Sequence, residues 1–506
     1  MFSPQVHRKI YLVLLTLLGG CMVTSIGMTN VMWVLLLSNW VLEGRWNEKW
    51  QMARKSRLLQ AIVVFFLIHV VGLLWTSNMA AGLHVVEREL PLLVVPLVVL
   101  TTRPPQGRIR QIIMGVYMTT VFVVSIIGVV RWFTIPELPY RDIVPFISHI
   151  RFSLNCCMVI FLALFGILQE KKIGVKILFV ALILWMIVFL LLLQSYTAFV
   201  VLLMASLVVI FRLRRRFVWL TLWLIIVGTA VVMVVIGVKE YYYMMPQATD
   251  PLVLATVNGR LYDHKLDGFV ENGNYVNNYL CLDELEQEWP RRSDVPLDSL
   301  TSSGFSVEAA LVRYLNALGL TKDSVGVAAL TEEQVAEIGR GVANPVYEHG
   351  SAPKKMLYVM LFEYENYRCF RAVEGFTMLQ RLELWKTTLR IIGCHPWIGV
   401  GTGDLGDEME ADFRATQSSL QGSRLMPHDE YLTLTAQFGI PIVVLLLLCF
   451  LRATPALRRQ STLMMAWLVA ILLSFITENT LDSLAGIMFC TYFLSFRNQK
   501  CTNTIR

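Results

Sequence analysis

Charged residues are scarce in this chain. Only 16% of its 506 residues are Asp, Glu, Lys or Arg, against 56% hydrophobic residues, and the mean hydropathy is +0.57. A soluble enzyme of this length needs a much more polar surface. The low charge therefore excludes an ordinary soluble protein and indicates a chain that lies in a lipid bilayer.

Several motifs are also absent from the sequence. It contains no Walker motif, GxSxG elbow, HExxH pair, CxxC pair or carboxylate cluster with metal-ligand spacing. ATP-driven transport, a structural zinc site and metallohydrolysis therefore lack support, and we expect neither a metal nor a cofactor. The first apolar run has no convincing small-residue cleavage site, so we expect it to be retained rather than removed as a signal peptide.

Twelve apolar runs are candidates for crossing a bilayer. A spanning helix needs about 20 mostly apolar residues, because lipid offers no hydrogen-bond partner to the backbone. The sequence therefore predicts an all-α polytopic membrane protein with about twelve transmembrane helices. The predicted spans are residues 10–25, 27–42, 58–76, 88–102, 111–133, 150–168, 174–194, 195–211, 217–238, 430–451, 461–477 and 481–496.

Basic residues in alternate loops set the orientation of these spans. Lys and Arg in short loops stay on the cytoplasmic side. The intervening segment 239–428 holds 17 Lys and Arg against 26 Asp and Glu, which leaves 27 against 11 elsewhere. Both termini are therefore predicted to be cytoplasmic, and we expect no nucleic-acid partner, because the basic residues do not share one soluble face. The basic loops are at 8–9, 45–57, 103–110, 171–176, 212–216, 452–459 and 497–506.

This order predicts three parts: transmembrane helices 1 to 9 in residues 1–238, a mostly helical outer domain in 239–428, and helices 10 to 12 with a cytoplasmic tail in 429–506. Within the outer domain, Thr331 and Gln334 have the spacing of a capping box that begins a helix.

A second helix is predicted from about Gly375 to Ile392, with its apolar side at Leu379, Leu382, Trp385, Leu389 and Ile392. The outer domain also has cysteines at positions 281, 369 and 394, which could form one disulfide or stay reduced.

Ionisable side chains at the outer ends of spans are the candidate functional residues, because charge near lipid is costly and often functional. His428 precedes a span, and its imidazole is suited to accept a proton. The alternative is an interfacial histidine bonded to Asp429 or Glu430. Arg381 offers a guanidinium fork for a phosphate, whereas the alternative is a cation–aromatic pair with Trp385.

Three more groups lie at the predicted outer face. Arg151 and His149 open a span there, although arginine is disfavoured on this side; snorkelling to lipid headgroups is the alternative. Arg88 is flanked by two glutamates, so ion pairing with them already explains it. The GVGTGD turn at 399–404 could offer backbone N–H groups to an anion, but isolated glycines more often only form a turn.

Six segments resemble one known family. The strongest are QRLELWKTTLRIIGCHPWIGVGTGDL at 380–405 and PHDEYLTLTAQFGIPIVVLLLL at 427–448; the others are SHIRFSLN at 148–155, and residues 258–280, 313–338 and 477–496. The family that they resemble is the O-antigen ligase and O-antigen polymerase superfamily of bacterial envelope glycosyltransferases. Two positions depart from its pattern: Asp429 replaces an Asn, and Tyr196 replaces the Arg of a Ser-Arg-Thr motif.

The resemblance implies a membrane glycosyltransferase of the GT-C type in the cell inner membrane, with a periplasmic outer domain. Such enzymes take a preassembled glycan from undecaprenyl pyrophosphate without a metal or nucleotide sugar. We expect a ligase that passes the glycan to a lipid A core sugar; a polymerase, a protein O-oligosaccharyltransferase and a non-enzymatic glycan transporter or assembly scaffold are the alternatives. The predicted catalytic residues are His428 and Arg381, and the predicted pyrophosphate- or glycan-binding residues are Arg151, His149, Tyr196, Arg88 and Trp385.

Overall fold

The protein consists of two compact units, seen in a computed structural model. The first contains residues 1–220 and 381–506, and the second contains residues 221–380. The predicted outer domain of residues 239–428 overlaps the second unit and extends into the first. The structure describes residues 3–136, 138–212, 216–243, 252–266, 268–301, 304–370, 377–458 and 461–497.

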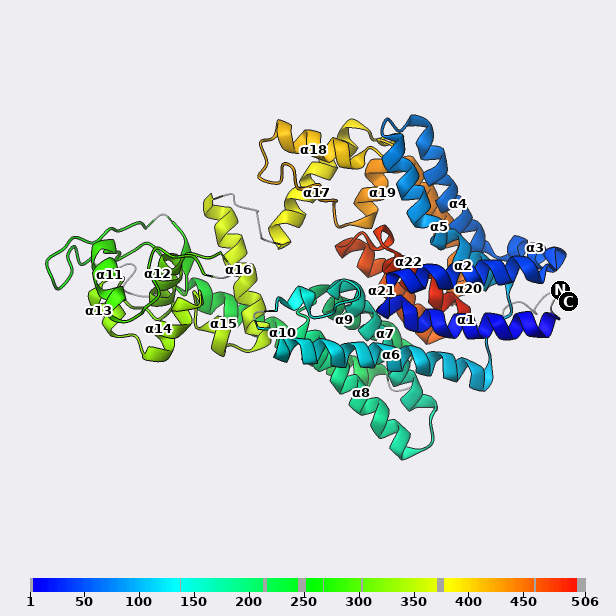
Figure 1. Cartoon of the computed structure of the whole chain (residues 1–506), viewed down its shortest axis with the longest axis horizontal. Helices are drawn as coiled ribbons and strands as arrows, with labels where there is room; N and C mark the ends of the chain where they lie inside the picture. Colours follow the sequence, from blue (N-terminus) through cyan, green and yellow to red (C-terminus); the bar gives the residue numbers. More distant parts are fainter. Residues whose placement is uncertain are drawn as a thin grey trace. The chain divides into compact units, whose positions relative to one another are not determined.

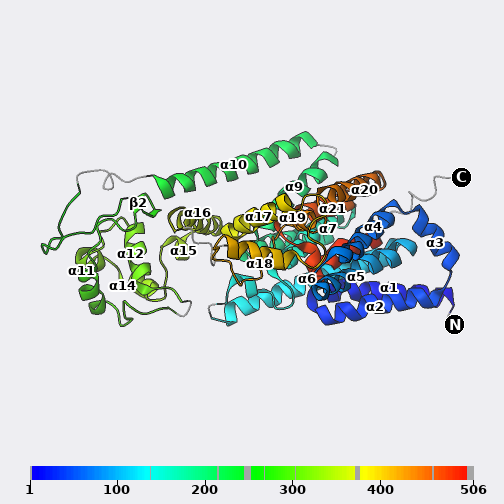
Figure 2. The same ribbon diagram turned by 90° about the horizontal axis from the view of Figure 1, so that it is seen from above.

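The first unit is a bundle of helices, and α1 and α2 run side by side in both views (Figure 1 and Figure 2). Its N-terminal helices are α1 Pro4–Thr24, α2 Ile26–Glu43, α3 Trp46–Lys55, α4 Arg57–Val71, α5 Met79–Thr101, α6 Gly107–Thr134, α7 His149–Gln169, α8 Ile173–Leu192 and α9 Tyr196–Arg212. The later helices are α17 Thr377–Cys394, which begins before the boundary, α18 Leu405–Ala415, α19 Glu430–Phe438, α20 Ile440–Arg458, α21 Thr462–Thr477 and α22 Leu484–Tyr492. Short 3-10 turns are η1 Gly72–Trp75, η2 Tyr140–Asp142, η5 Thr480–Asp482 and η6 Phe493–Phe496.

Helices occupy the positions of the twelve predicted spans, and the all-α prediction is confirmed. Among the described residues, seven helices are long and apolar enough to cross a membrane: α1, α2, α4 with η1, α6, α7, α8 and α10. Helices α9, α20, α21 and α22 with η6 are shorter apolar helices. Several basic residues of the predicted orientation, Arg214, Arg215, Arg459, Lys500 and Arg506, lie outside the described residues.

The predicted span 430–451 is not one helix, and this prediction was wrong. Helix α19 ends at Phe438, helix α20 begins at Ile440, and Gly439 between them has φ +79°. A side chain at Gly439 would lie 2.4 Å from the Trp397 carbonyl carbon and oxygen. The backbone N–H of Ile440 donates to the carbonyl of Pro396 at 2.9 Å. The close passage of residues 396–397 therefore breaks the helix, and an apolar run cannot reveal such a contact.

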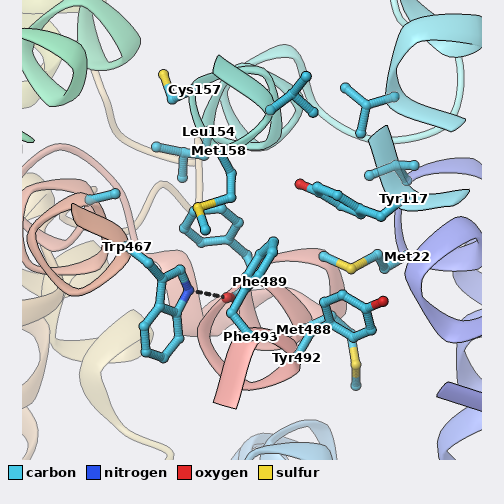
Figure 3. Packing of buried hydrophobic residues seen from close by; sticks show 14 of the residues in the cluster. Met22, Tyr117, Leu154, Cys157, Met158, Trp467, Met488, Phe489, Tyr492 and Phe493 are labelled. Carbon is cyan, nitrogen blue, oxygen red and sulfur yellow. Dashed lines mark hydrogen bonds between the residues drawn. The ribbon is translucent and has the colours of Figure 1, made fainter. Parts of the chain in front are cut away.

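The core of the first unit joins helices that are far apart in the sequence. Figure 3 shows Met22 of α1, Tyr117 of α6 and Trp467 of α21 near Phe489 and Phe493. The Trp467 indole donates to the Phe489 carbonyl at 2.9 Å, and the Tyr117 ring packs edge-on to Phe493 at 5.3 Å. Because large buried aromatics dominate packing energies, these contacts fix α21 and α22, and with them the connecting loop 478–483.

Helix α17 carries Arg381 and Trp385. Its predicted start, Gly375, lies outside the described residues. The predicted apolar side is partly wrong, because Leu382 and Leu389 are 45% and 56% exposed whereas Leu384 is fully buried. Two buried threonines, at 387 and 388, share the inner face with Leu384. The Thr388 hydroxyl donates to the Leu384 carbonyl at 2.7 Å, so this polar group is satisfied within the helix and does not mark an exposed face.

The second unit contains two long helices, several short ones and one small hairpin. Its elements are α10 Arg216–Tyr242, which begins before the boundary, β1 Val270–Glu271, β2 Asn274–Tyr275, α11 Leu282–Glu288, η4 Trp289–Arg291, α12 Val307–Ala317, α13 Ser324–Ala328, α14 Glu332–Gly339, α15 Val346–His349 and α16 Ala352–Phe370. The strands pair antiparallel, with Val270 opposite Tyr275.

The second unit packs around the fully buried Trp289. A buried carboxylate, Glu271, accepts two hydrogen bonds from Arg313 at 2.9 and 3.0 Å. The predicted capping box of Thr331 and Gln334 is confirmed at the start of α14. Two of the three cysteines in the predicted outer domain, Cys281 and Cys394, are free thiols.

Candidate functional site

A single carboxylate joins the two residues predicted to be catalytic. Glu478 follows the last residue of α21, and its side chain is only 7% exposed. Arg381 Nη2 contacts Glu478 Oε1 at 2.7 Å, and His428 Nδ1 lies 3.4 Å from Glu478 Oε2. Three segments distant in the sequence, α17, the loop before α19 and the loop after α21, therefore meet at Glu478.

Glu478 is ionised in this arrangement. Burial alone raises the pKa of a carboxyl group, because it disfavours the charged form. The contact with His428 and the charges of the nearby arginines outweigh burial and hold the pKa of Glu478 below its ordinary value. An ionised Glu478 carboxylate that contacts the Arg381 guanidinium and the His428 ring is thus the stable state of this residue at neutral pH.

Arg151 reaches the same loop from α7. Ser148 caps this helix, and its hydroxyl accepts a hydrogen bond from Arg151 Nη1 at 3.1 Å. Arg151 Nη2 donates to the carbonyl of Asn479 at 3.2 Å. The residue after Glu478 therefore holds a second guanidinium beside the cluster.

Arg88 joins the far end of this loop rather than pairing with its sequence neighbours. Its Nη2 contacts Asp482 Oδ1 at 2.6 Å. The other oxygen of Asp482 accepts a hydrogen bond from Asn479 Nδ2 at 2.9 Å. The loop 478–482 thus links Arg88 to the arginines of α7 and α17 through its own side chains and backbone.

The three arginines share an unusual feature. In Arg88, Arg151 and Arg381 the Nε atom is buried and has no hydrogen-bond partner in the part of the chain that the structure describes. A buried donor without an acceptor is unfavourable, and a guanidinium presents its N–H groups in a fork that fits phosphate oxygens. The cluster therefore has donor capacity that a phosphate-bearing ligand could use.

Helix α19 holds the loop in place. Glu430 Oε2 accepts a hydrogen bond from the backbone of Leu481 at 3.0 Å, and Thr433 Oγ1 donates to the Asn479 side chain at 3.2 Å. Asp429 caps α19 by accepting from the Leu432 N–H at 2.8 Å. The carboxylates of Asp429 and Glu430 are thus used in structural hydrogen bonds, and the acidic group facing His428 is Glu478 instead.

His428 lies in a strained turn, Pro427–Glu430, that we call the histidine turn. Its φ is +52°, a left-handed conformation that is uncommon outside glycine. The Trp385 indole of α17 donates to the Pro427 carbonyl at 3.0 Å, which ties the turn to the helix that carries Arg381. The His428 side chain is 37% exposed, so its ring is accessible to a substrate while one nitrogen faces Glu478. Strain of this kind is often found at functional sites.

The remaining predicted binding residues lie around this site at helix starts. His149 begins α7, and its ring packs edge-on to Tyr140 at 5.8 Å. Tyr196 begins α9 and is 39% exposed. Its neighbours point inward: Ser195 bonds Ser153 at 2.8 Å, and Thr197 bonds Thr477 at 3.0 Å. Thr477 immediately precedes Glu478, which places the start of α9 beside the cluster.

A second turn, Pro396–Asp404, has a structural role; we call it the glycine turn. The N–H groups of Gly399, Val400, Gly401 and Gly403 all donate to protein acceptors. The Asp404 carboxylate accepts from two backbone N–H groups, at positions 77 and 78, both at 2.7 Å. These N–H groups are therefore already occupied, which favours the simple turn over an anion site.

The second unit contains a group of possible metal ligands. The ligand atoms of Glu333, Glu337 and His349 lie within 4.8 Å of one another. The Glu337 carboxylate already contacts His349 at 2.9 Å and accepts from the Tyr314 hydroxyl at 2.6 Å. These contacts account for the grouping, and we assign no metal to it.

Comparison with known proteins adds one finding. Residues 356–447 match the family model described as O-antigen ligase. The match supports the O-antigen ligase superfamily. The matched segment contains Arg381, His428 and both turns, whereas Arg151 and Glu478 lie outside it. No curated protein matches this chain. The family match and the apolar helices support a membrane protein similar to the ligase and polymerase class of glycosyltransferases, a class whose substrates are in general lipid-linked glycans and lipid A core.

Glu478 is the site residue that sequence reasoning missed. It lies in a segment, TENTLDSL at 477–484, that resembles the family, but no role was assigned to its carboxylate. One signal was available: an acidic residue at the end of an apolar run is costly in lipid unless it is paired. The predicted outer-end position of this segment, which His428 and Arg151 share, therefore indicates Glu478 as a partner for them.

Proposed function

We propose that this chain is an O-antigen ligase-like glycosyltransferase. It moves a preassembled glycan from undecaprenyl pyrophosphate to a hydroxyl group of a lipid A core sugar at the periplasmic face of the inner membrane, with both of its termini in the cytoplasm. The observation that carries this proposal is the contact of Arg381 and His428 with one buried carboxylate, Glu478, next to Arg151. Two of these residues lie in the segment that matches the family.

The proposed reaction divides its tasks among these residues. A ring nitrogen of His428 accepts the proton of the acceptor hydroxyl, and the resulting oxygen attacks the anomeric carbon of the glycan. The new glycosidic C–O bond forms as the bond from that carbon to the pyrophosphate oxygen breaks. The leaving undecaprenyl pyrophosphate keeps the electron pair of that bond. The proton on His428 then passes to solvent.

Arginines supply the charge stabilisation that this leaving group requires. The negative charge on the pyrophosphate grows as the bond breaks, so fixed positive groups stabilise the transition state more than the ground state. Arg381 and Arg151 keep buried Nε–H donors for this purpose. A metal ion would serve the same electrostatic task, so the proposal does not require one. Arg88, His149, Tyr196 and Trp385 are assigned to binding of the pyrophosphate or glycan and to support of the two turns.

The proposal is tested by transfer assays with purified full-length protein, an undecaprenyl-pyrophosphate-linked glycan and a lipid A core acceptor. We expect His428→Ala to lower the transfer rate by about 10²–10⁴-fold, the usual contribution of a general base. Arg381→Ala is expected to lower it by roughly 10²-fold or more, because one stabilising donor is lost. The control variants are His395→Ala and Lys386→Ala; His395 is exposed and the Lys386 side chain is 52% exposed, and Lys386 shares α17 with Arg381.

Several outcomes separate the alternatives. Full activity of both His428→Ala and Arg381→Ala would contradict the assignment. A transporter or scaffold would need no general base, so His428→Ala would then keep full function. If the enzyme lengthens the lipid-linked glycan but leaves lipid A core unmodified, the chain is a polymerase instead of a ligase.

A further inference from the structure

A separate pocket of about 390 Å³ lies within the second unit. Three short segments form it, joined by the bridges of Leu280 to Asp263 and to Lys322. Its volume is at the lower end of the range for small-molecule sites, roughly 300–1,000 Å³. Its lining includes Tyr262, Asn274, Asn278, Tyr279 and Lys322.

Lys322 is the unusual member of this pocket. It is only 3% exposed, and its ammonium group donates to the Asn316 amide oxygen at 2.8 Å. Among the described residues, no carboxylate forms an ion pair with it. The amide nitrogen of Asn316 in turn donates to the Glu271 carbonyl at 2.7 Å, so the amide is held with its oxygen toward the lysine. A buried ammonium without a counter-charge is unfavourable, and burial lowers the pKa of Lys322 to about 7.

Two aromatic rings accompany the lysine. The Tyr262 and Tyr279 rings lie 5.4 Å apart in an edge-on arrangement, and the Tyr262 hydroxyl donates to Asp323. Tyr279 has φ +55°, a conformation that is a genuine outlier for a bulky residue. Its N–H donates to the Asn278 side-chain oxygen at 3.0 Å, which helps to hold the strained residue in place. Aromatic surface next to a few fixed polar groups is the usual composition of a small-ligand site.

The charge of the pocket restricts its ligand. A single ammonium matches a single negative charge, whereas phosphate groups are more often recognised by the bidentate fork of arginine. Among the described residues that line the pocket, none is an arginine. The ring faces of the tyrosines fit the apolar face of a sugar ring, and the asparagine amides fit its hydroxyl groups.

We propose that this pocket binds a sugar unit that carries one carboxylate, with the carboxylate placed on Lys322. The choice of a sugar rests on the proposed function, in which the donor is a glycan; the preference for an anion rests on Lys322 itself. The second unit would then recognise an acidic sugar of the transferred glycan.

Direct binding to the full-length protein tests this inference. Saturation-transfer NMR would compare methyl β-D-glucuronide with methyl β-D-glucoside on protein in a detergent without a sugar headgroup. We expect a saturable signal for the glucuronide and binding at least tenfold weaker for the glucoside. Lys322→Met is expected to weaken glucuronide binding by at least tenfold, whereas the exposed Lys265→Met, in the same unit, is expected to leave it unchanged.

Two further variants, Tyr279→Gly and Arg381→Ala, test the inference independently of Lys322→Met. Tyr279→Gly removes the ring yet suits a positive φ, so we expect this variant to keep its melting temperature and still lose glucuronide binding. Equal binding of both glycosides, or glucuronide binding retained in both Lys322→Met and Tyr279→Gly, would overturn the inference. Arg381→Ala should lose glycan transfer but bind the glucuronide normally, which separates a failure of the pocket from a failure of the proposed function.

Discussion

The glycine turn and the histidine turn belong to the same family-matched segment but are built in opposite ways. In the glycine turn, N–H groups at 399, 400, 401 and 403 bond protein acceptors, and a side chain at Gly399 would lie 2.3 Å from the Gln437 backbone. In the histidine turn, His428 is strained, 37% exposed and paired with a carboxylate from another helix end. One turn is closed by its own contacts, whereas the other presents the imidazole that we propose as the general base.

The two turns illustrate two different reasons why a motif contains particular residues: close packing of the backbone in one turn and the placement of an exposed histidine in the other. Glycines are required where the backbone of one segment passes closely against another. A glycine there has no side chain that could take part in a reaction. A histidine held in a left-handed conformation needs support from its surroundings, here Asp429 in the cap and the indole of Trp385. The glycine turn should therefore respond to mutation through stability, and the histidine turn through activity.

Among the variants that compare the two turns, the largest effect should come from Glu478→Gln, which keeps the shape of the side chain but removes the charge between Arg381 and His428. We expect transfer activity to fall on the order of 10²-fold, because we propose that Glu478 is a positioning residue that orients His428. Stability at pH 7 should fall by about 1–3 kcal/mol, the value of hydrogen bonds to a charged group.

The pH dependence provides an independent check of Glu478. Its pKa in the folded protein is below the ordinary value of 4.5, so its contribution to stability is complete above that pH and is lost as the pH falls through the folded value. Thermal unfolding of wild type and Glu478→Gln should therefore differ at pH 7 and converge as the pH falls below 4.5 and through the folded pKa of Glu478. Rescue of activity by Glu478→Asp would support orientation by a charge. A constant difference at all pH values would contradict the ionised pair.

Most helices could be predicted from the sequence, because the patterns that indicate them lie within short segments of the chain. An apolar run is enough to predict a spanning helix, and the spacing of Thr331 and Gln334 was enough to place the start of α14. The errors arose where a distant contact decided the outcome. Gly439 interrupts an apolar run because the Trp397 backbone lies against it, and no residue near Gly439 signals that contact.

The individual residues of the candidate site could be predicted from the sequence, but their arrangement in space could not. The sequence indicated His428, Arg381 and Arg151 as candidates, because an ionisable side chain at a helix end near lipid is energetically costly. The common partner of His428 and Arg381 is Glu478, which is 97 residues from Arg381, and its place depends on how α21 and α22 pack. Linear spacing carries no information on a distance of that kind.

An intermediate effect is expected from Gly399→Ala in the glycine turn. The added methyl group would lie 2.3 Å from the Gln437 carbonyl carbon, and φ is +64°. We expect the free energy of unfolding to fall by roughly 2–4 kcal/mol, while transfer activity per folded molecule stays near that of wild type. Gly393→Ala is the matched control: this glycine lies in α17 with open space around it, so alanine should raise stability by about 0.5–1 kcal/mol. Loss of activity in folded Gly399→Ala would mean that the glycine turn also contributes to the chemistry.

The smallest effect is expected from Asp429→Asn, which restores the residue that the family pattern commonly has after the histidine. The Asp429 side chain accepts the Leu432 N–H at the start of α19, and an amide oxygen serves this purpose as well as a carboxylate. Burial also raises the pKa of Asp429, so its charge is disfavoured where it lies. We therefore expect stability within about 0.5 kcal/mol of wild type and unchanged transfer, measured by thermal unfolding and the same assay. Asp429→Ala, which removes the cap, should cost about 1 kcal/mol. If Asn at this position instead lowered activity strongly, the charge of Asp429 would belong to the reaction, and the histidine turn would contain two functional groups rather than one.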